Sequence, residues 1–210
     1  MTTDPRERLA AGVAALRLEL GAAELEALLA LAALVREWNR KFNLTAITDP
    51  VEMVDKHLLD SLTVQPWIRG PFVTDVGTGA GFPGLPLAIV NPTLRFTLID
   101  STGKKIRFVE HAATTLGLTN VNAVCTRAEN FRPAQRAGSV VSRALGPVGT
   151  FVAQAGHLAA KAGRLLAMKG RDPAAELAEL PKGWRVSGVE RLAVPGLPDE
   201  RHLVILEQAP

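Results

Sequence analysis

The sequence is poor in the residues that build cross-links and metal centres. It holds a single cysteine, Cys125, so an internal disulfide framework is excluded and a reducing compartment is indicated. Cys125 lies in the apolar run 121–125 and is predicted to be a buried strand residue. The four histidines have no partners at the spacing of metal ligands, and no Cys/His cluster exists. We therefore expect no bound metal.

Long apolar stretches and the motifs of common hydrolytic sites are also missing. No uninterrupted run of about 18 apolar residues is available to cross a bilayer, and the first residues lack the apolar core of a signal peptide. We expect a cytoplasmic protein without membrane contact. The nucleophile elbow G-x-S-x-G and the P-loop G-x-x-x-x-G-K-[ST] are absent. These absences favour group transfer from a bound donor over hydrolysis.

The overall composition is that of an ordinary folded chain. With 210 residues, 47% of them hydrophobic and 21% charged, the chain fits one domain with one core. The formal net charge is +3 and the isoelectric point is about 9.3, which permits an anionic partner such as nucleic acid without requiring one. Nothing in the sequence indicates an obligate protein partner, and we expect a monomer.

The most informative stretch is the segment 75–84, Asp-Val-Gly-Thr-Gly-Ala-Gly-Phe-Pro-Gly. It follows an apolar run and precedes a helical pattern, so it is predicted to be a strand end, a tight turn and a helix start. Glycine suits such a turn because it adopts positive φ and lets a ligand approach the backbone closely. We expect a nucleotide-like cofactor to lie across this turn.

The register of the glycines decides which cofactor is favoured. Residues 79–84 satisfy the dinucleotide pattern G-x-G-x-x-G. However, Gly77 comes directly off the strand and opens the alternative pattern G-x-G-x-G, with Asp75 two residues before it. Pro83 also removes a backbone N–H that a pyrophosphate would use at a helix start. An acid before the turn favours a cationic ligand, S-adenosylmethionine, with S-adenosylhomocysteine as product.

Two hydrophobic patterns divide the chain near residue 70. Residues 1–70 read as helical, with helices expected over about 5–21, 22–42 and 50–66. This N-terminal helical extension is expected to pack on the core of the remaining domain. Whether it also turns basic and amide residues toward a substrate stays open.

From residue 71 to residue 210, strand-like runs alternate with helical patterns, which predicts βαβ units and a parallel sheet covered on both faces. A final pair of strands adds an antiparallel strand, a feature of methyltransferase sheets. We therefore expect an α/β, Rossmann-like class I S-adenosylmethionine-dependent methyltransferase domain with a mostly parallel seven-stranded sheet. The strands are expected at 72–76, 94–99, 121–125, 139–142, 163–168, 184–193 and 202–207, and the helices at 83–90, 103–117, 127–131, 147–161 and 174–180.

Charged residues follow several of these strands. Asp100 ends the second strand, where it could bind ribose hydroxyls or only cap the next helix. Glu129 follows the third strand, near the expected adenine, or is simply a surface acid. Arg143 follows the fourth strand, beside the point where the strand order should reverse. Because burying an unpaired charge is costly, Arg143 is either salt-bridged or aimed at substrate and cofactor.

Five blocks occur in the order and spacing of one family, and between about residues 25 and 206 the chain resembles the glucose-inhibited division protein B family. Members of this family are bacterial methyltransferases of 16S ribosomal RNA. The blocks are Trp38 to Ile47, His57 to Leu62, the segment 75–84, Asp100-Ser101 with Lys104-Lys105, and Ser142-Arg143-Ala144.

This resemblance implies methyl transfer from S-adenosylmethionine to N7 of one guanine in 16S ribosomal RNA of the small subunit. Arg143 would act through orientation and electrostatics, since guanine N7 carries an in-plane lone pair and needs no general base. The cofactor contacts implied by position are Gly77, Phe82, Ala128, Glu129 and Arg143, and the arguments above add Asp75, Gly79, Gly81, Asp100 and Ser101. The residues implied to meet RNA are Asn43, Lys104, Lys105, Arg127, Lys169 and Arg201.

Three other functions remain open on the sequence. A nicotinamide-dependent oxidoreductase would use the register 79–84, bind NAD and ignore S-adenosylhomocysteine. A non-enzymatic RNA- or ribosome-binding protein with a vestigial cofactor fold would bind RNA in a salt-dependent way without turnover. A methyltransferase acting on protein or small molecules is the third, and the basic isoelectric point weakens it.

Overall fold

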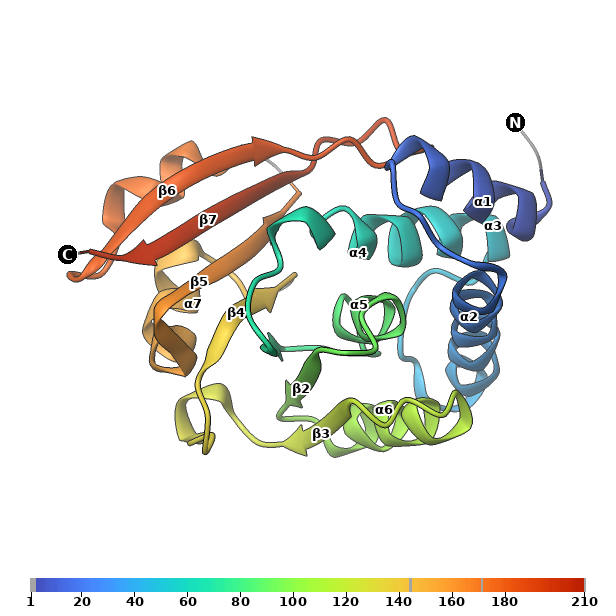
Figure 1. The fold of residues 1–210 in the computed structure, drawn as a ribbon, viewed down its shortest axis with the longest axis horizontal. Helices are drawn as coiled ribbons and strands as arrows, with labels where there is room; N and C mark the ends of the chain where they lie inside the picture. Colours follow the sequence, from blue (N-terminus) through green and yellow to red (C-terminus); the bar gives the residue numbers. More distant parts are fainter. Residues whose placement is uncertain (1–2, 144, 171, 210) are drawn as a thin grey trace.

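One seven-stranded sheet organises the described part of the chain, residues 3–143, 145–170 and 172–209 of a computed structural model. Ala144, which closes one of the blocks above, lies outside the described residues. The strand order is β3-β2-β1-β4-β5-β7-β6, and β7 is antiparallel to both of its neighbours while β1 to β5 pair in parallel (Figure 1). The strands are β1 Phe72–Val76, β2 Arg95–Asp100, β3 Val121–Cys125, β4 Ala137–Ser142, β5 Ala159–Lys169, β6 Trp184–Arg191 and β7 His202–Gln208.

The strand order places a crevice at the carboxyl ends of the strands. The order of the strands reverses between β1 and β4, and in open α/β sheets ligands bind outside the carboxyl ends of the strands at such a point. Val73, Val76, Val140 and Val141 of these two strands are almost completely buried, as expected for parallel strands that are covered on both faces. The predicted mostly parallel sheet with one antiparallel strand is confirmed.

Helices cover both faces of the sheet and build two separate cores (Figure 1). On one face α2 contacts α5 and α6, while α1 and α4 complete the same layer. On the other face α7 packs with short 3-10 turns at 128–130, 156–158 and 174–179. The helices are α1 Pro5–Ala15, α2 Ala22–Phe42, α3 Pro50–Met53, α4 Asp60–Leu62, α5 Gly84–Val90, α6 Gly103–Thr115 and α7 Val148–Ala155.

The N-terminal helices share the core of the sheet domain. Leu28, Leu31 and Val35 of α2 are fully buried in the same hydrophobic cluster as Phe108 of α6 and Leu85 of α5. Burying a side chain of this kind contributes about 1.5–3 kcal/mol relative to exposure. The helical extension is therefore held by the apolar stripe that its sequence predicts. The exact division of the chain at residue 70 stays a prediction.

The third N-terminal helix differs from the expected regular helix. It begins as predicted, with Asp49 Oδ1 accepting hydrogen bonds from the backbone nitrogens of Val51 and Glu52 at 3.0 and 2.9 Å. It then continues as a π-helix over Val54–Leu59 between α3 and α4. The expectation of one helix to residue 66 is wrong in this respect. The wider turn matters because π-helical turns concentrate at functional sites.

Two other helix boundaries are also corrected. The first helix ends at Ala15, six residues early, because Arg17 adopts a left-handed φ of 57° that stops it. The helix expected at 147–161 ends at Ala155, and β5 begins at Ala159, where it pairs with Ala137 of β4. Sheet pairing therefore takes residues that the local pattern assigned to a helix.

The segment expected as a helix at 174–180 is instead a 3-10 helix over Ala174–Glu179.

Cys125 is exposed rather than buried. It ends β3, which is the edge strand of the sheet, so the apolar run around it is covered less than a central strand would be.

Candidate functional site

A buried carboxylate braces the glycine-rich turn after β1. Asp75 is fully buried, and its Oδ2 accepts hydrogen bonds from Thr78 Oγ1 at 2.6 Å and from the backbone nitrogen of Gly84 at 2.8 Å. Burial raises the pKa of Asp75 to about 6, against the effect of these two bonds. Its Oδ1 has no hydrogen-bond partner among the described residues. The buried Asp75 carboxylate thus links the turn, through Thr78, to the start of α5 at Gly84.

The turn itself depends on glycine. Gly77, Gly79 and Gly81 have φ values of 69°, 61° and 85°, a left-handed region in which other residues are strained. The backbone nitrogen of Gly77 donates to Ile99 O at 2.8 Å, which ties the turn to β2. A Cβ added at Gly79 would meet no atom within 4 Å. The outer side of the turn therefore faces open space.

A cavity of about 390 Å³ lies beside this turn, at the carboxyl ends of β1, β2 and β3. Its volume falls within the range of about 300–1,000 Å³ that is usual for small-molecule sites. We call it the glycine-loop cavity. Five of the predicted cofactor-binding residues line it, namely Gly77, Asp100, Ser101, Ala128 and Glu129.

Asp100 holds the backbone on two sides of the glycine-loop cavity. Its Oδ2 accepts a hydrogen bond from the Gly79 nitrogen at 3.0 Å, and its Oδ1 accepts one from the Thr102 nitrogen at 2.8 Å. Lys105 Nζ lies 3.6 Å from the same carboxylate. Because each carboxylate oxygen has two lone pairs, Asp100 retains capacity for a ligand hydroxyl. The local bond to Thr102 and a ribose contact are therefore compatible.

A second cavity, of about 340 Å³, lies beside the ends of β4 and β5. We call it the arginine cavity, since Arg143 and Arg201 both line it, together with Lys169. A smaller hollow of about 150 Å³ shares Leu145 with the glycine-loop cavity and Arg143 with the arginine cavity. The hollows thus follow one another along the carboxyl edge of the sheet.

Arg143 is salt-bridged, which answers one question that the sequence left open. Its Nη1 lies 3.2 Å from Asp60 Oδ2 and donates to Lys56 O at 3.1 Å. The guanidinium carbon also lies 5.4 Å from the centre of the Phe82 ring, within the range of a cation–π contact. The side chain keeps 24% of its surface exposed and lines the arginine cavity. Arg143 is therefore paired with Asp60 and also lines the arginine cavity.

His57 completes the wall behind Arg143. Its ring stacks on Phe82 at a centroid distance of 4.6 Å, and its Nε2 lies 2.8 Å from Thr45 Oγ1. Burial, and then the positive charge of Arg143, lowers the pKa of His57 to about 4. The ring is therefore neutral at pH 7, and no further positive charge is placed against Arg143.

Sequence reasoning missed His57, Asp60 and Thr45 as site residues. His57 and Asp60 both belong to the block His57 to Leu62. His57 lies in the π-helix and Asp60 directly follows it, and both side chains contact Arg143. Thr45 reaches the site from the loop after α2. The only signal for them lay in the two N-terminal blocks that resemble the family.

The other predicted residues divide between the two cavities and the surface. Lys105 and Arg127 line the glycine-loop cavity rather than a separate RNA surface. Lys104 and Asn43 are exposed and line neither cavity. The predicted cofactor contacts that are absent from the lining of the glycine-loop cavity are Asp75, Gly79, Gly81, Phe82 and Arg143.

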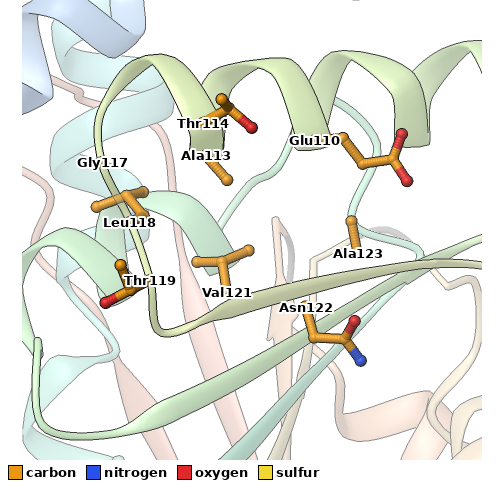
Figure 2. Close-up of a pocket in the computed structure, with 9 residues that line it drawn as sticks. All are labelled: Glu110, Ala113, Thr114, Gly117, Leu118, Thr119, Val121, Asn122 and Ala123. Carbon is orange, nitrogen blue, oxygen red and sulfur yellow. The ribbon is translucent and has the colours of Figure 1, made fainter.

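A further hollow of about 390 Å³ lies between α6 and the edge strand β3 (Figure 2). Glu110 and Thr114 project from the helix, and Val121 and Asn122 lie on the strand facing it, with Gly117 in the turn between (Figure 2). None of the predicted site residues lines it. It begins at the amino end of β3, away from the crevice between β1 and β4, so its size alone does not make it the site.

In the described ranges, no three His, Cys, Asp or Glu side chains are grouped closely enough to hold a metal ion. Among the helices that the structure describes, none is both long and apolar enough to cross a membrane.

The strand order, the glycine-rich turn after β1 and the acid at the end of β2 together define a class I S-adenosylmethionine-dependent methyltransferase fold. A solved S-adenosylmethionine-dependent methyltransferase from Aquifex aeolicus superposes with a TM-score of 0.55, over 71% of this chain and 90% of that one. At 20% sequence identity this likeness shows the fold. The fold class predicted from the sequence is confirmed.

Sequence comparison shows the family. The profile of the family "rRNA small subunit methyltransferase G" matches residues 24–204. The ribosomal RNA small subunit methyltransferase G of Chromohalobacter salexigens is 49% identical over 211 residues, which cover 100% of both chains. The protein of the same name from Marinobacter nauticus is 46% identical over 198 residues, covering 94% of this chain and 92% of its own. The chain belongs to the rRNA small subunit methyltransferase G family, which confirms the resemblance and excludes the oxidoreductase.

Proposed function

We propose that this chain transfers a methyl group from S-adenosylmethionine to N7 of a guanine in 16S ribosomal RNA of the small ribosomal subunit. The observation that carries the proposal is the pair of neighbouring cavities on either side of Arg143. One has acids and a glycine turn, which suit a cationic nucleoside. The other has arginines, which suit the acceptor-rich edge of a guanine.

The residues of the glycine-loop cavity fit the donor. Asp100 has free lone pairs for ribose hydroxyls, and the exposed Glu129 adds a second carboxylate near Ala128, where the adenine is expected. The open space outside Gly79 leaves room for close approach to the backbone. When bound, S-adenosylmethionine supplies an electrophilic methyl group on a sulfonium. The residues around it supply position and a matching electrostatic field.

The acceptor atom explains why the site needs no general base. Guanine N7 attacks through a lone pair in the plane of the ring, so no residue has to remove a proton. Arg143 can donate to guanine O6 and leave N7 free. The stacked rings of His57 and Phe82 pack against that arginine and restrict the movement of its side chain. In favourable cases such positioning lowers a barrier by about 7–11 kcal/mol.

The RNA target should be unpaired or splayed out, because base edges are not accessible in the deep major groove of an RNA helix. Lys104 is exposed beside the glycine-loop cavity, and Lys105 and Arg127 line that cavity. Positive side chains here suit contacts to phosphates, which position an RNA without reading its sequence.

We propose that the protein acts as a monomer in the cytoplasm.

A binding and transfer experiment tests this function. Calorimetry should show binding of S-adenosylhomocysteine and none of NAD. Radiolabelled S-adenosylmethionine should then label small ribosomal subunits from a strain that lacks the gene, but not large subunits from the same strain. Binding without transfer to any ribosomal substrate would favour a vestigial RNA-binding protein or another acceptor. Absence of cofactor binding would contradict the proposed role of the glycine-loop cavity.

A further inference from the structure

Asp60 is a buried carboxylate shared by two arginines. It follows the π-helix and has only 4% of its surface exposed. Its Oδ2 lies 3.2 Å from Arg143 Nη1, and its Oδ1 lies 3.3 Å from Arg201 Nε. Arg143 follows β4 and Arg201 immediately precedes β7. One carboxylate therefore links the end of β4 to the start of β7.

The remaining contacts of the two arginines limit how they can move. Arg143 also donates to Lys56 O, and its Nη2 lies 3.5 Å from His57 Nδ1. Arg201 Nη1 donates to the backbone oxygen of Glu200 at 2.8 Å, and its Nη2 lies 4.0 Å from a carboxylate oxygen of Asp199. A guanidinium has five N–H donors in a fixed fork, so each arginine keeps donors beyond those that the protein uses.

The arginine cavity offers these donors beside apolar walls. Both arginine side chains keep 24% of their surface exposed and line the cavity. Ile47, Met168 and Leu192 also line it. Apolar surfaces with a few fixed polar groups are typical of sites for planar heterocycles. Donors on one wall match a base edge that presents acceptors.

We propose that Asp60 is a positioning residue, which holds Arg143 and Arg201 as a paired donor wall and makes the arginine cavity selective for a purine with a carbonyl oxygen at position 6. This rests on the proposed function. Guanine presents O6 and N7 as acceptors on that edge, whereas adenine presents an amino donor in place of O6. A base without the carbonyl leaves desolvated arginine donors unpaired, and sites built for a hydrogen bond reject such analogues strongly.

The main alternative is that Asp60 only stabilises the fold, as buried ion pairs can do without any role in selectivity. Asp55 provides a matched control. It belongs to the π-helix that Asp60 follows, has 6% of its surface exposed, and accepts two hydrogen bonds of 2.8 Å from Arg8. It lines neither the arginine cavity nor the glycine-loop cavity. Asp55→Asn therefore weakens a comparable buried ion pair away from the site.

The test compares wild type, Asp60→Asn and Asp55→Asn on small subunits reconstituted with guanine or 2-aminopurine at the target position. The analogue keeps N7 and lacks O6. Wild type should prefer guanine by at least about tenfold in kcat/KM. Asp60→Asn should lower kcat/KM on guanine by at least about tenfold and narrow the preference to within about threefold. It should bind S-adenosylhomocysteine within about twofold of wild type. Asp55→Asn should keep the full preference.

Retention of the wild-type preference by Asp60→Asn would overturn the proposal, as would equal use of both bases by wild type. If Asp60→Asn does not fold, Arg201→Gln takes its place, since that side chain is partly exposed. A preference unchanged in Arg201→Gln would then overturn it. Failure of wild type to methylate guanine-containing subunits at all would instead contradict the proposed function itself.

Discussion

The backbone nitrogen of Gly79 donates a hydrogen bond to Asp100 Oδ2 at 3.0 Å. This bond joins the turn after β1 to the end of β2 across the floor of the crevice. Gly79 itself adopts a left-handed φ of 61°, a conformation that favours glycine. A single contact thereby sets both the shape of the glycine turn and the orientation of the acid that is proposed to meet the ribose.

Gly79→Ala should weaken cofactor binding more than it weakens the fold. An alanine in the left-handed region costs about 1–2 kcal/mol, and its Cβ would enter the open space beside the cavity. Gly117→Ala is the control, because Gly117 has a φ of 66° and equally open surroundings but lies after α6. Calorimetry and thermal melts should show similar destabilisation in both variants, with a loss of S-adenosylhomocysteine affinity only in Gly79→Ala. Equal affinities in both would contradict this account.

Asp100→Asn should remove discrimination between ribose and deoxyribose forms of the ligand. Hydrogen bonds to a charged group contribute about 1.5–3 kcal/mol, so wild type should bind S-adenosylhomocysteine at least tenfold more tightly than its 2′,3′-dideoxy analogue. The variant should bind the two ligands nearly equally. If the residue only braced Gly79 and Thr102, both affinities would fall together and their ratio would persist.

His57 should make the fold sensitive to mild acid. Its pKa is lowered from 6.5 to about 4 in the folded chain, so between these values the unfolded chain binds the proton and the folded chain does not. Stability therefore falls as pH drops through this window, by roughly 3 kcal/mol in all. Urea unfolding from pH 7 to pH 4 should show a shallower loss in His57→Gln than in wild type. A loss in His57→Gln as steep as in wild type would contradict this account.

Arg143→Ala should abolish most methyl transfer while the fold survives. The change leaves Asp60 paired with Arg201 alone, which should cost about 1–3 kcal/mol. Loss of a positioned donor should lower kcat by about 100-fold or more. Arg185→Ala is the control, since Arg185 pairs with Glu207 on the surface of β6 and is 54% exposed. Near-wild-type transfer by Arg143→Ala would show that Arg143 is misplaced in the site.

The sheet and the glycine turn could be predicted because their signals are local. Each central strand is an apolar run, and positive φ at Gly77 follows from the chemistry of a tight turn. The end of α7 could not be predicted, since the residues from Ala159 onward join β5 through pairing with β4. Exposure of Cys125 likewise depends on its place at the sheet edge, which a local apolar run does not encode.

The partners of Arg143 were not predictable for a related reason. Asp60 lies 83 residues before it in sequence, and only the π-helical turn at Val54–Leu59 brings the carboxylate and His57 to the arginine. A regular helix would point these side chains in other directions. The sequence thus indicated that Arg143 is either paired or in the site, while the structure shows that it is paired and also lines the cavity.

The most direct test is a transfer assay with tritiated S-adenosylmethionine on small subunits from a strain lacking this gene, followed by nucleoside analysis of the digested RNA. We predict a labelled peak of 7-methylguanosine from one site in 16S ribosomal RNA, present with wild type and strongly reduced with Arg143→Ala. Label in any other nucleoside, or no incorporation by a protein that still binds the cofactor, would contradict the proposed acceptor.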